Sequence, residues 1–147
     1  MKIYKTRTVK TPQRGTSRSA GLDFFVPDDF KHVWLDLGEA VNIPSGIKAK
    51  VPEGYMLIAQ NKSGVAVKKG LQVGACVIDE DYQGEIHLHV RNISNKIQVI
   101  SPGEKLVQMV LVPVSYEDVE IVSSLKELYE GKVSERGSGG FGSTGTK

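Results

Sequence analysis

Short apolar runs separated by turns recur along most of the chain. In residues 85–90 (Glu-Ile-His-Leu-His-Val) apolar side chains alternate with polar ones, which is the period of a strand with one buried face. Glycine and proline separate neighbouring runs at residues 43–46, 51–54 and 101–103. Many short strands with regular turns predict an all-β protein, a sandwich or jelly-roll-like distorted barrel, rather than alternating βαβ units.

Three stretches depart from this strand pattern. Residues 64–69 fit one short helix, and residues 116–129 are ambiguous between a strand and a helical turn. Residues 131–147 contain six glycines and few apolar side chains. Such a segment buries too little surface to offset the entropy lost when it is ordered alone. We therefore predict a β domain over residues 1–130, followed by a flexible glycine-rich arm that orders on binding.

The composition suits one folded domain. Of 147 residues, 39% are hydrophobic and 24% are charged, which supplies enough apolar material for a core. A single cysteine excludes a disulfide framework and a multi-cysteine zinc site. No apolar run reaches the length of a membrane span, and the first residues lack the apolar stretch of a secretion signal. We therefore expect a cytoplasmic protein with no membrane partner.

The net charge of +2 is unevenly distributed along the chain. Residues 1–19 carry six basic side chains and no acidic one, whereas residues 115–130 carry five acidic side chains against Lys126. The basic stretch is not dense, and Tyr4 is its only aromatic residue. A solvated charged surface is the simpler interpretation, so we expect no direct nucleic-acid binding.

Residues 136–145 (Arg-Gly-Ser-Gly-Gly-Phe-Gly-Ser-Thr-Gly) have the ingredients of a phosphate clamp. Closely spaced glycines let backbone N–H groups converge on one anion, hydroxyls add donors, and Arg136 offers a planar fork. The stretch is not a Walker A loop, because it lacks the Gly-Lys-Ser/Thr ending. Phe141 has no core to join among these glycines, which favours stacking on a flat ligand.

Residues 79–85 (Asp-Glu-Asp-Tyr-Gln-Gly-Glu) place carboxylates at an expected hairpin between two β runs. One carboxylate beside a bound phosphate could act as a general base, and others could hold a hydrated divalent cation. Taken alone, the stretch is better interpreted as an acidic turn exposed to solvent. Gln108 interrupts an apolar run, where a buried amide needs partners. We expect Cys76 to be a buried small residue. We also expect His87 and His89 to face solvent or a subunit contact.

Five segments, taken together, carry a further signal. They are residues 20–24 (Ala-Gly-Leu-Asp-Phe), 61–66 (Asn-Lys-Ser-Gly-Val-Ala), 76–85 (Cys-Val-Ile-Asp-Glu-Asp-Tyr-Gln-Gly-Glu), 103–109 (Gly-Glu-Lys-Leu-Val-Gln-Met) and the glycine-rich tail. In this order they resemble the five motifs of the homotrimeric dUTPases (deoxyuridine triphosphate nucleotidohydrolases). The first three family motifs read Ala-Gly-x-Asp-Leu, Pro-Arg-Ser-Gly-Leu-Ala and Gly-Val-Ile-Asp-x-Asp-Tyr-x-Gly. The resemblance runs from about residue 20 to the C-terminus.

The resemblance implies a jelly-roll subunit, three of which assemble as a homotrimer with active sites at their interfaces. It implies hydrolysis of dUTP to dUMP and pyrophosphate, which limits uracil entry into DNA and supplies dUMP for thymidylate synthesis. Asp79 would deprotonate a water that attacks the α-phosphorus. The hairpin before it, with Val73, Cys76 and Val77, would read uracil and exclude thymine. Tyr82 would pack on the deoxyribose and leave no room for a 2′-hydroxyl.

The resemblance also assigns residues to the phosphates and to a metal ion. Lys62, Ser63 and Gly64 would contact the phosphates. Mg²⁺ would bridge the three phosphates and keep several waters, through which Asp23 and Gln108 would meet it.

The tail, donated by another subunit, would close over the site as a lid. Phe141 would lie over uracil, and Gly142 is a further substrate-binding residue. Arg136, Ser143 and Thr144 would bind the γ-phosphate. Closure would exclude bulk water and position the attack.

Among the departures from the family pattern, those at positions 61, 62 and 76 bear on the expected site. Lys62 stands where arginine is usual, so a point charge replaces a bidentate fork, and we expect weaker phosphate orientation there. Cys76 stands where glycine is usual beside the uracil pocket, which predicts either strain or a changed pocket wall. Asn61 replaces proline, and we expect this change to have little effect.

Two other functions are compatible with parts of the sequence. The dCTP deaminases resemble dUTPases in fold but carry a catalytic glutamate where this chain has His89, which disfavours deamination. A non-catalytic, nucleotide-responsive module would also use an ordering arm and the acidic stretch at residues 115–130. The presence of Asp79, Tyr82 and Arg136 together favours catalysis.

Overall fold

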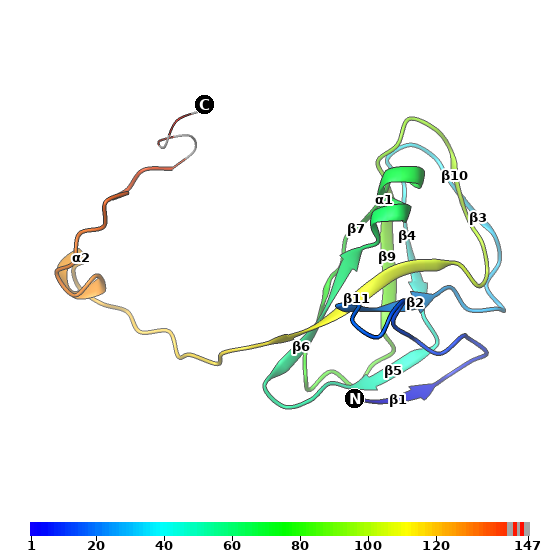
Figure 1. The fold of residues 1–147 in the computed structure, drawn as a ribbon, viewed down its shortest axis with the longest axis horizontal. Coiled ribbons are helices and arrows are strands. Elements are labelled where there is room, and N and C mark those ends of the chain that lie inside the picture. The colour runs from blue at the N-terminus through cyan, green and yellow to red at the C-terminus, as the bar shows by residue number, and fades with distance from the viewer. Residues whose placement is uncertain (141–142, 144, 146–147) are drawn as a thin grey trace. The chain divides into compact units, whose positions relative to one another are not determined.

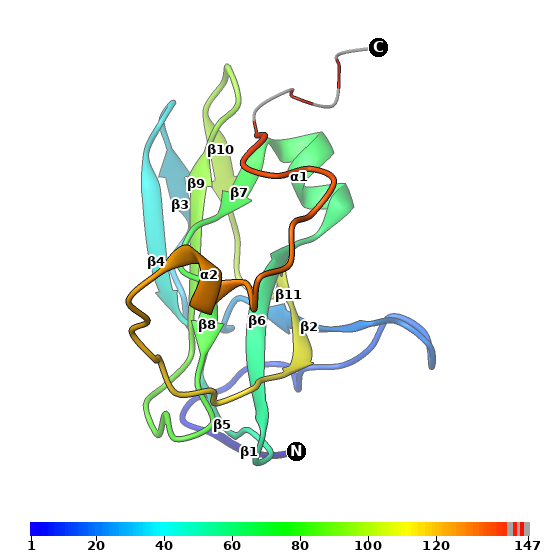
Figure 2. The same ribbon diagram turned by 90° about the vertical axis from the view of Figure 1, so that its left-hand side faces the viewer.

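The computed structural model describes residues 1–140, 143 and 145 of the chain. The chain divides into two compact units, Met1–Ser115 and Tyr116–Lys147, and each is described by itself. The first unit consists almost entirely of short strands, as Figure 1 and Figure 2 show from two sides. The all-β prediction is therefore confirmed.

Two antiparallel sheets form the body of the first unit. The larger sheet has four strands, in the order β2 (Gly21–Phe25), β11 (Lys105–Pro113), β6 (Tyr55–Asn61) and β8 (Val77–Ile78). The other has three strands, in the order β4 (Ala40–Pro44), β9 (His87–Asn92) and β7 (Leu71–Val73). Two ribbons pair β1 (Lys2–Lys5) with β5 (Ile47–Lys50) and β3 (Val33–Leu35) with β10 (Gln98–Ile100). Among the described residues these ladders do not close into a barrel.

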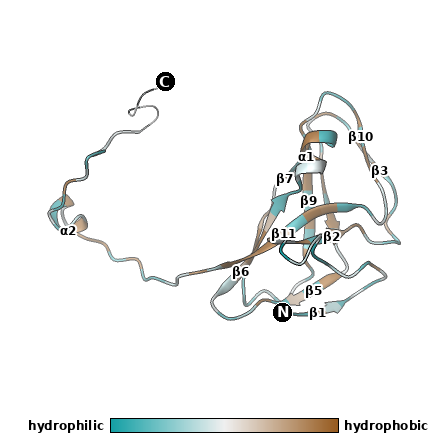
Figure 3. Cartoon of the chain, viewed as in Figure 1, coloured by the Kyte–Doolittle hydropathy of each residue, from teal (hydrophilic) through white to brown (hydrophobic). Residues whose placement is uncertain are grey.

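One cluster of buried apolar side chains joins the two sheets. Its members include Phe24, Leu57 and Met109 from the four-stranded sheet and Ile43, Leu71 and Leu88 from the three-stranded sheet. The alternation predicted for residues 85–90 contributes to it, because Leu88 and Val90 are buried while His87 and Arg91 are exposed. Apolar stretches along β9 and β11 are visible in Figure 3. Each fully buried Leu or Phe contributes about 1.5–3 kcal/mol, so this cluster is the main source of stability.

The helix predicted at residues 64–69 is confirmed as α1 (Ser63–Lys69), which follows β6 almost directly. It ends at Gly70, whose φ of 62° is left-handed and whose N–H donates to the Ala66 carbonyl at 3.0 Å. A Cβ at Gly70 would also lie 2.6 Å from the Cβ of Ser94. A side chain at this position would therefore be both strained and crowded.

The hairpin expected across residues 79–85 is wrong. β8 precedes this stretch and pairs with β6, whereas β9 follows it and pairs with β4 and β7. The acidic stretch therefore connects the two sheets instead of turning back within one. β7 and β8 also lie in different sheets, so residues 74–76 cross from the three-stranded sheet to the four-stranded sheet.

The second unit contains a second helix, α2 (Leu125–Leu128), within the stretch that the sequence left ambiguous. The Ser124 hydroxyl accepts a hydrogen bond from the Glu127 N–H at 3.2 Å, and the Glu127 carboxylate accepts one from the Ser123 N–H at 3.0 Å. The Ser123 N–H, and then the Ser123 hydroxyl, lower the pKa of the Glu127 carboxyl. In the part of the chain that the structure describes, no helix is long and apolar enough to cross a bilayer.

Asn92, at the end of β9, is a buried polar residue whose amide is hydrogen-bonded at both ends. Its Nδ2 donates to the carbonyl oxygens of Leu35 and Lys96, each at 2.9 Å. Its Oδ1 accepts from the Ser94 N–H, also at 2.9 Å. These bonds fix the loop after β9 against the end of β3.

Replacing Asn92 with alanine should lower the free energy of unfolding by about 1–3 kcal/mol, because backbone groups around it lose their hydrogen-bond partner. Urea denaturation would measure the loss. The matched control is Asn95→Ala at an exposed position of the same loop, which should change the free energy by less than about 0.5 kcal/mol. Equal losses in the two variants would contradict the role assigned to Asn92.

Candidate active site

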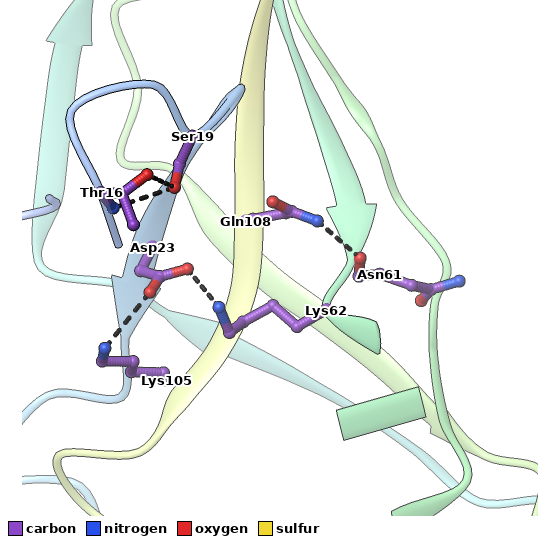
Figure 4. Close-up of polar contacts among 7 residues, drawn as sticks. All are labelled: Thr16, Ser19, Asp23, Asn61, Lys62, Lys105 and Gln108. Atoms are coloured by element: carbon purple, nitrogen blue, oxygen red, sulfur yellow. Dashed lines mark hydrogen bonds and ion pairs between the residues drawn. The ribbon is translucent and has the colours of Figure 1, made fainter. Parts of the chain in front are cut away.

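β2, β6 and β11 bring one group of polar side chains together (Figure 4). Gln108 lies in the central strand β11, opposite Asp23 of β2 on one side and Gln60 of β6 on the other. β6 ends at Asn61, so Lys62 leaves the sheet close to Asp23. The Asp23 group, as defined here, contains Asp23, Asn61, Lys62, Lys105 and Gln108.

The Asp23 carboxylate is the buried centre of this group. Its side chain is 8% exposed, and Oδ1 accepts a hydrogen bond from Lys62 Nζ. Oδ2 lies 3.4 Å from Lys105 Nζ, so the carboxylate is placed between two ammonium groups (Figure 4). A carboxylate removed from water requires such partners. Two positive charges against one negative leave the cluster with a net charge of +1, which suits an anionic ligand.

Gln108 has the partner that a polar residue in an apolar run requires. Its Nε2 donates to the Asn61 carbonyl oxygen at 2.9 Å. Its Oε1 accepts no hydrogen bond from the described residues. A Cβ at Gly21 would lie 2.6 Å from this Oε1, so the glycine keeps space for the carboxamide.

The first residues of α1 are next to the Asp23 group in the sequence and are exposed. Lys62 is the N-cap residue of α1, without a side-chain capping bond. Ser63 and Gly64 are exposed, and nothing lies within 4 Å of a Cβ built at Gly64. Packing of the chain therefore does not require a glycine at this position.

Residues 73–77, between β7 and β8, form a second part of the site and are termed the crossing segment. The Val73 N–H donates to Asn61 Oδ1 at 2.8 Å, which connects the segment to the Asp23 group. The Ala75 N–H donates to His89 Nδ1 at 3.3 Å. Two side chains from outside the segment therefore hold its backbone.

The middle of the crossing segment has both bonded and unbonded backbone groups. The Gly74 N–H donates to the His89 carbonyl at 3.1 Å, and the Cys76 carbonyl accepts the Ala59 N–H at 2.7 Å. Within the described ranges, the Cys76 N–H and the carbonyls of Gly74 and Ala75 make no hydrogen bond. These groups are available to a ligand.

One expectation about this region is wrong. Cys76 is exposed rather than buried, and its neighbour Val77 is 51% exposed. His89 is half-buried, and its ring lies against the crossing segment. A Cβ at Gly74 would lie 2.1 Å from His89 Nδ1, so this close approach requires glycine.

Sequence analysis missed the contacts of Asn61 and His89 with the crossing segment. The position of His89 beside residues 74 and 75 depends on the pairing of β9 with β7, for which the sequence pattern gives no local signal.

The carboxylates after β8 are of two kinds. Glu80 and Glu85 each accept the N–H of a turn glycine at 2.6 Å, which fixes the stretch to neighbouring turns. Asp79 and Asp81 are exposed, and their carboxylates form no hydrogen bond or ion pair with the described residues. Only Ile78 separates Asp79 from the crossing segment. Of the carboxylates after β8, that of Asp79 is therefore the best placed to act on a ligand bound at this segment.

Tyr82 packs on the same stretch. Its hydroxyl donates to the Glu85 carbonyl at 3.0 Å, and a Cβ at Gly84 would lie 2.2 Å from that hydroxyl oxygen. The side chain is thus held over Gly84 while the residue stays 43% exposed. It also borders a cavity of about 400 Å³ whose lining includes residues of β1 and β5.

The predicted site residues of the first unit fall into two sets. No hydrogen bond or ion pair joins Asp79 or Tyr82 to the Asp23 group in the part of the chain described. Nor do the described residues contain a cluster of three His, Cys, Asp or Glu side chains that could hold a metal ion.

Arg136 and Ser143 belong to the second unit. Arg136 Nε donates to the Gly139 carbonyl at 2.9 Å, and the Ser143 N–H donates to the Gly140 carbonyl at 3.0 Å. Three further predicted residues lie outside the described residues: Phe141, Gly142 and Thr144.

The chain matches known proteins over most of its length. A family model described as dUTPase matches residues 7–145. A deoxyuridine 5'-triphosphate nucleotidohydrolase of Hydrogenobaculum sp. (strain Y04AAS1) is 43% identical over 138 residues, which are 92% of this chain and 90% of the relative. The protein of the same name from Mus musculus is 37% identical over 134 residues, covering 91% of this chain and 77% of the relative.

Solved structures share the fold. A mutant dUTPase of Staphylococcus bacteriophage 80alpha, with dUpNHpp, has a TM-score of 0.84 at 24% identity and covers 99% of this chain and 98% of that chain. A mutant dUTPase of phage phi11 of S. aureus, described with the coordination of a structural Mg(II) ion, has a TM-score of 0.74 at 23% identity and covers 85% and 97%. These likenesses confirm the jelly-roll-like fold class.

Replacing Asp23 with asparagine should lower the free energy of unfolding by about 1–2 kcal/mol, because Lys62 and Lys105 lose their common counter-charge. The effect is smaller than for a fully buried pair because the two lysine side chains are 23% and 46% exposed. Urea denaturation would measure it. Asp29→Asn is the matched control, since that side chain is 58% exposed and 3.7 Å from Arg7, and it should cost less than about 0.5 kcal/mol. An Asp23→Asn variant as stable as wild type would contradict the central role of this carboxylate.

Proposed function

This chain belongs to the dUTPase family, and we propose that it hydrolyses dUTP to dUMP and pyrophosphate, with Asp79 activating the water that attacks the α-phosphorus. The match of the family model to residues 7–145 carries the proposal. The exposed, unpaired carboxylate of Asp79 supports the role of general base, because no described group competes for its oxygens. In the cytoplasm this activity would limit uracil entry into DNA and supply dUMP for thymidylate synthesis.

The crossing segment reads the base in this proposal. The Watson–Crick edge of uracil has one N–H donor with a carbonyl acceptor on each side of it. The unbonded Cys76 N–H can donate to one of these carbonyls, and an unbonded carbonyl of Gly74 or Ala75 can accept the uracil N–H. Val73, Cys76 and Val77 form the wall that rejects the 5-methyl group of thymine. Tyr82, held over Gly84 and partly exposed, packs on the deoxyribose and leaves no room for a 2′-hydroxyl.

The phosphates bind at the Asp23 group and the start of α1. The net positive charge around Asp23 favours a triphosphate, and Lys62 brings one of its ammonium groups from the N-cap of α1. No packing contact explains the glycine at position 64, and close approach of a phosphate to the backbone of Ser63 and Gly64 would explain it.

The residues present fit a hydrated Mg²⁺ ion. Asp23 is already paired with two lysines, and Gln108 Oε1 is free of other hydrogen bonds from the described chain. Both side chains would therefore meet Mg²⁺ through its waters, while the substrate phosphates supply the direct ligands. When bound, the ion neutralises charge on the triphosphate.

A homotrimer with shared active sites completes the proposal. Within the described chain, no bond connects Asp79 and Tyr82 to the Asp23 group, which is consistent with a site completed by a second subunit. Val119 and Ile121 are each 94% exposed, and no described residue of the second unit belongs to the core cluster, so both side chains are suited to packing against another subunit.

The arm, predicted to follow the β domain after residue 130, comprises residues 131–147. It closes over the bound nucleotide. Phe141 lies over uracil and Gly142 contacts the substrate. The γ-phosphate is bound by Arg136, Ser143 and Thr144. Closure excludes bulk water from the attacking site and positions the reactants.

With Mg²⁺ present, the protein should release pyrophosphate from dUTP at least about a hundredfold faster than from dTTP, dCTP or UTP. A chelator should stop the release. Turnover of several nucleotides would leave a hydrolase but contradict the assigned selectivity of Tyr82 and the crossing segment. Binding of dUTP without any pyrophosphate would favour the nucleotide-responsive module instead.

Replacing Asp79 with asparagine should reduce turnover of dUTP by about 10²–10⁴-fold, because the base is lost while the shape is kept. Calorimetry of dUTP binding in the variant should give a Kd within a few-fold of wild type. Asp28→Asn, at another exposed aspartate, is the matched control and should leave turnover unchanged. Near wild-type turnover in Asp79→Asn would refute the assignment of the base.

A further inference from the structure

The crossing segment has to present a fixed set of backbone groups if it is to distinguish one base from another. It lies between two sheets and has no ladder of its own over residues 74–76. A segment of this kind, with a glycine at position 74, is free to change conformation unless side chains hold it.

Asn61 holds the start of the segment. It is the last residue of β6, and its backbone carbonyl is fixed by Gln108 Nε2 at 2.9 Å. Its side-chain oxygen then accepts the Val73 N–H at 2.8 Å. The side chain of Asn61 therefore fixes the beginning of the crossing segment relative to the four-stranded sheet.

His89 holds the middle of the segment. Its backbone carbonyl accepts the Gly74 N–H at 3.1 Å, and its ring nitrogen Nδ1 lies 3.3 Å from the Ala75 nitrogen. The neutral ring must carry its proton on Nε2 for Nδ1 to accept this bond. The ring also occupies the space over Gly74 that a Cβ would need.

We propose that Asn61 and His89 are positioning residues that fix the crossing segment and thereby set which backbone groups face the base. They engage the N–H groups of Val73 and Ala75 and leave the Cys76 N–H as the unbonded donor. The choice of donor is a specificity determinant, because a different free N–H would meet a different edge of the base. The kinetic consequence of this proposal rests on the proposed function. Its structural consequence can be tested in the free protein.

The first test needs no substrate. Amide hydrogen exchange by NMR on the full chain should show reduced protection of Ala75 in His89→Leu and of Val73 in Asn61→Ala, by about tenfold each. His89→Asn places a side-chain oxygen near the position of Nδ1 and should restore protection of Ala75. His87→Leu, on the same strand but exposed, is the matched control and should leave both amides unchanged.

The second test is kinetic. His89→Leu should raise KM for dUTP about five- to tenfold with kcat within about twofold, because a base contact made equally in the ground state and the transition state affects binding alone. Discrimination against dTTP should fall in the same variant, and His89→Asn should restore both values. His87→Leu should behave as wild type.

Unchanged protection of Ala75 in His89→Leu would overturn the proposal, as would lost protection with unchanged KM and selectivity. If His89→Leu does not fold, Asn61→Ala gives the corresponding readout at Val73, where unchanged protection would overturn the proposal. A wild-type protein that does not hydrolyse dUTP would refute the proposed function, while the exchange data would still decide whether these two residues hold the segment.

Discussion

The register of β11 between β2 and β6 is the constraint on which the polar site depends. Val107 and Met109 are buried in the core, and Gln108 between them is half-buried with its side chain directed to Asn61. A slip of one residue would bury Gln108 and expose Met109, so the apolar side chains oppose it strongly. The hydrophobic core thus sets which positions of β2, β6 and β11 lie opposite one another in the Asp23 group.

The crossing segment depends on a different set of pairings. β7 is fixed by β9 and β8 by β6, so the residues between them must span two sheets that belong to one core. Such a link has few ladder bonds of its own, which leaves backbone groups free for recognition. The same lack of bonds makes its conformation dependent on side chains from neighbouring strands. Asn61 is informative here, because proline, found at this position in the family motif, has no side-chain oxygen to offer Val73.

Features with local causes could be predicted from the sequence. The alternation at residues 85–90 and the short helix at residues 64–69 arise from periodicity and turn residues, and the structure contains both. The hairpin at residues 79–85 was wrong because strand order is decided by contacts distant in sequence. The motif resemblance selected Asp23 and Gln108, yet their partners follow from strand register. The contact of His89 with the crossing segment was missed for the same reason.

In the proposed function, the lysine at position 62 departs from the family motif but still offers a positive charge to the phosphates. An ammonium group on a flexible stem can hold Asp23 in the free protein and still reach an incoming phosphate. Lys105 lies 3.4 Å from the other carboxylate oxygen and would keep Asp23 paired if Lys62 turned to a phosphate. The carboxylate and its remaining lysine would then be neutral together, and the buried aspartate would not repel a triphosphate. Arginine would bind a phosphate with two parallel hydrogen bonds, whereas lysine trades that orientation for the freedom to change partners.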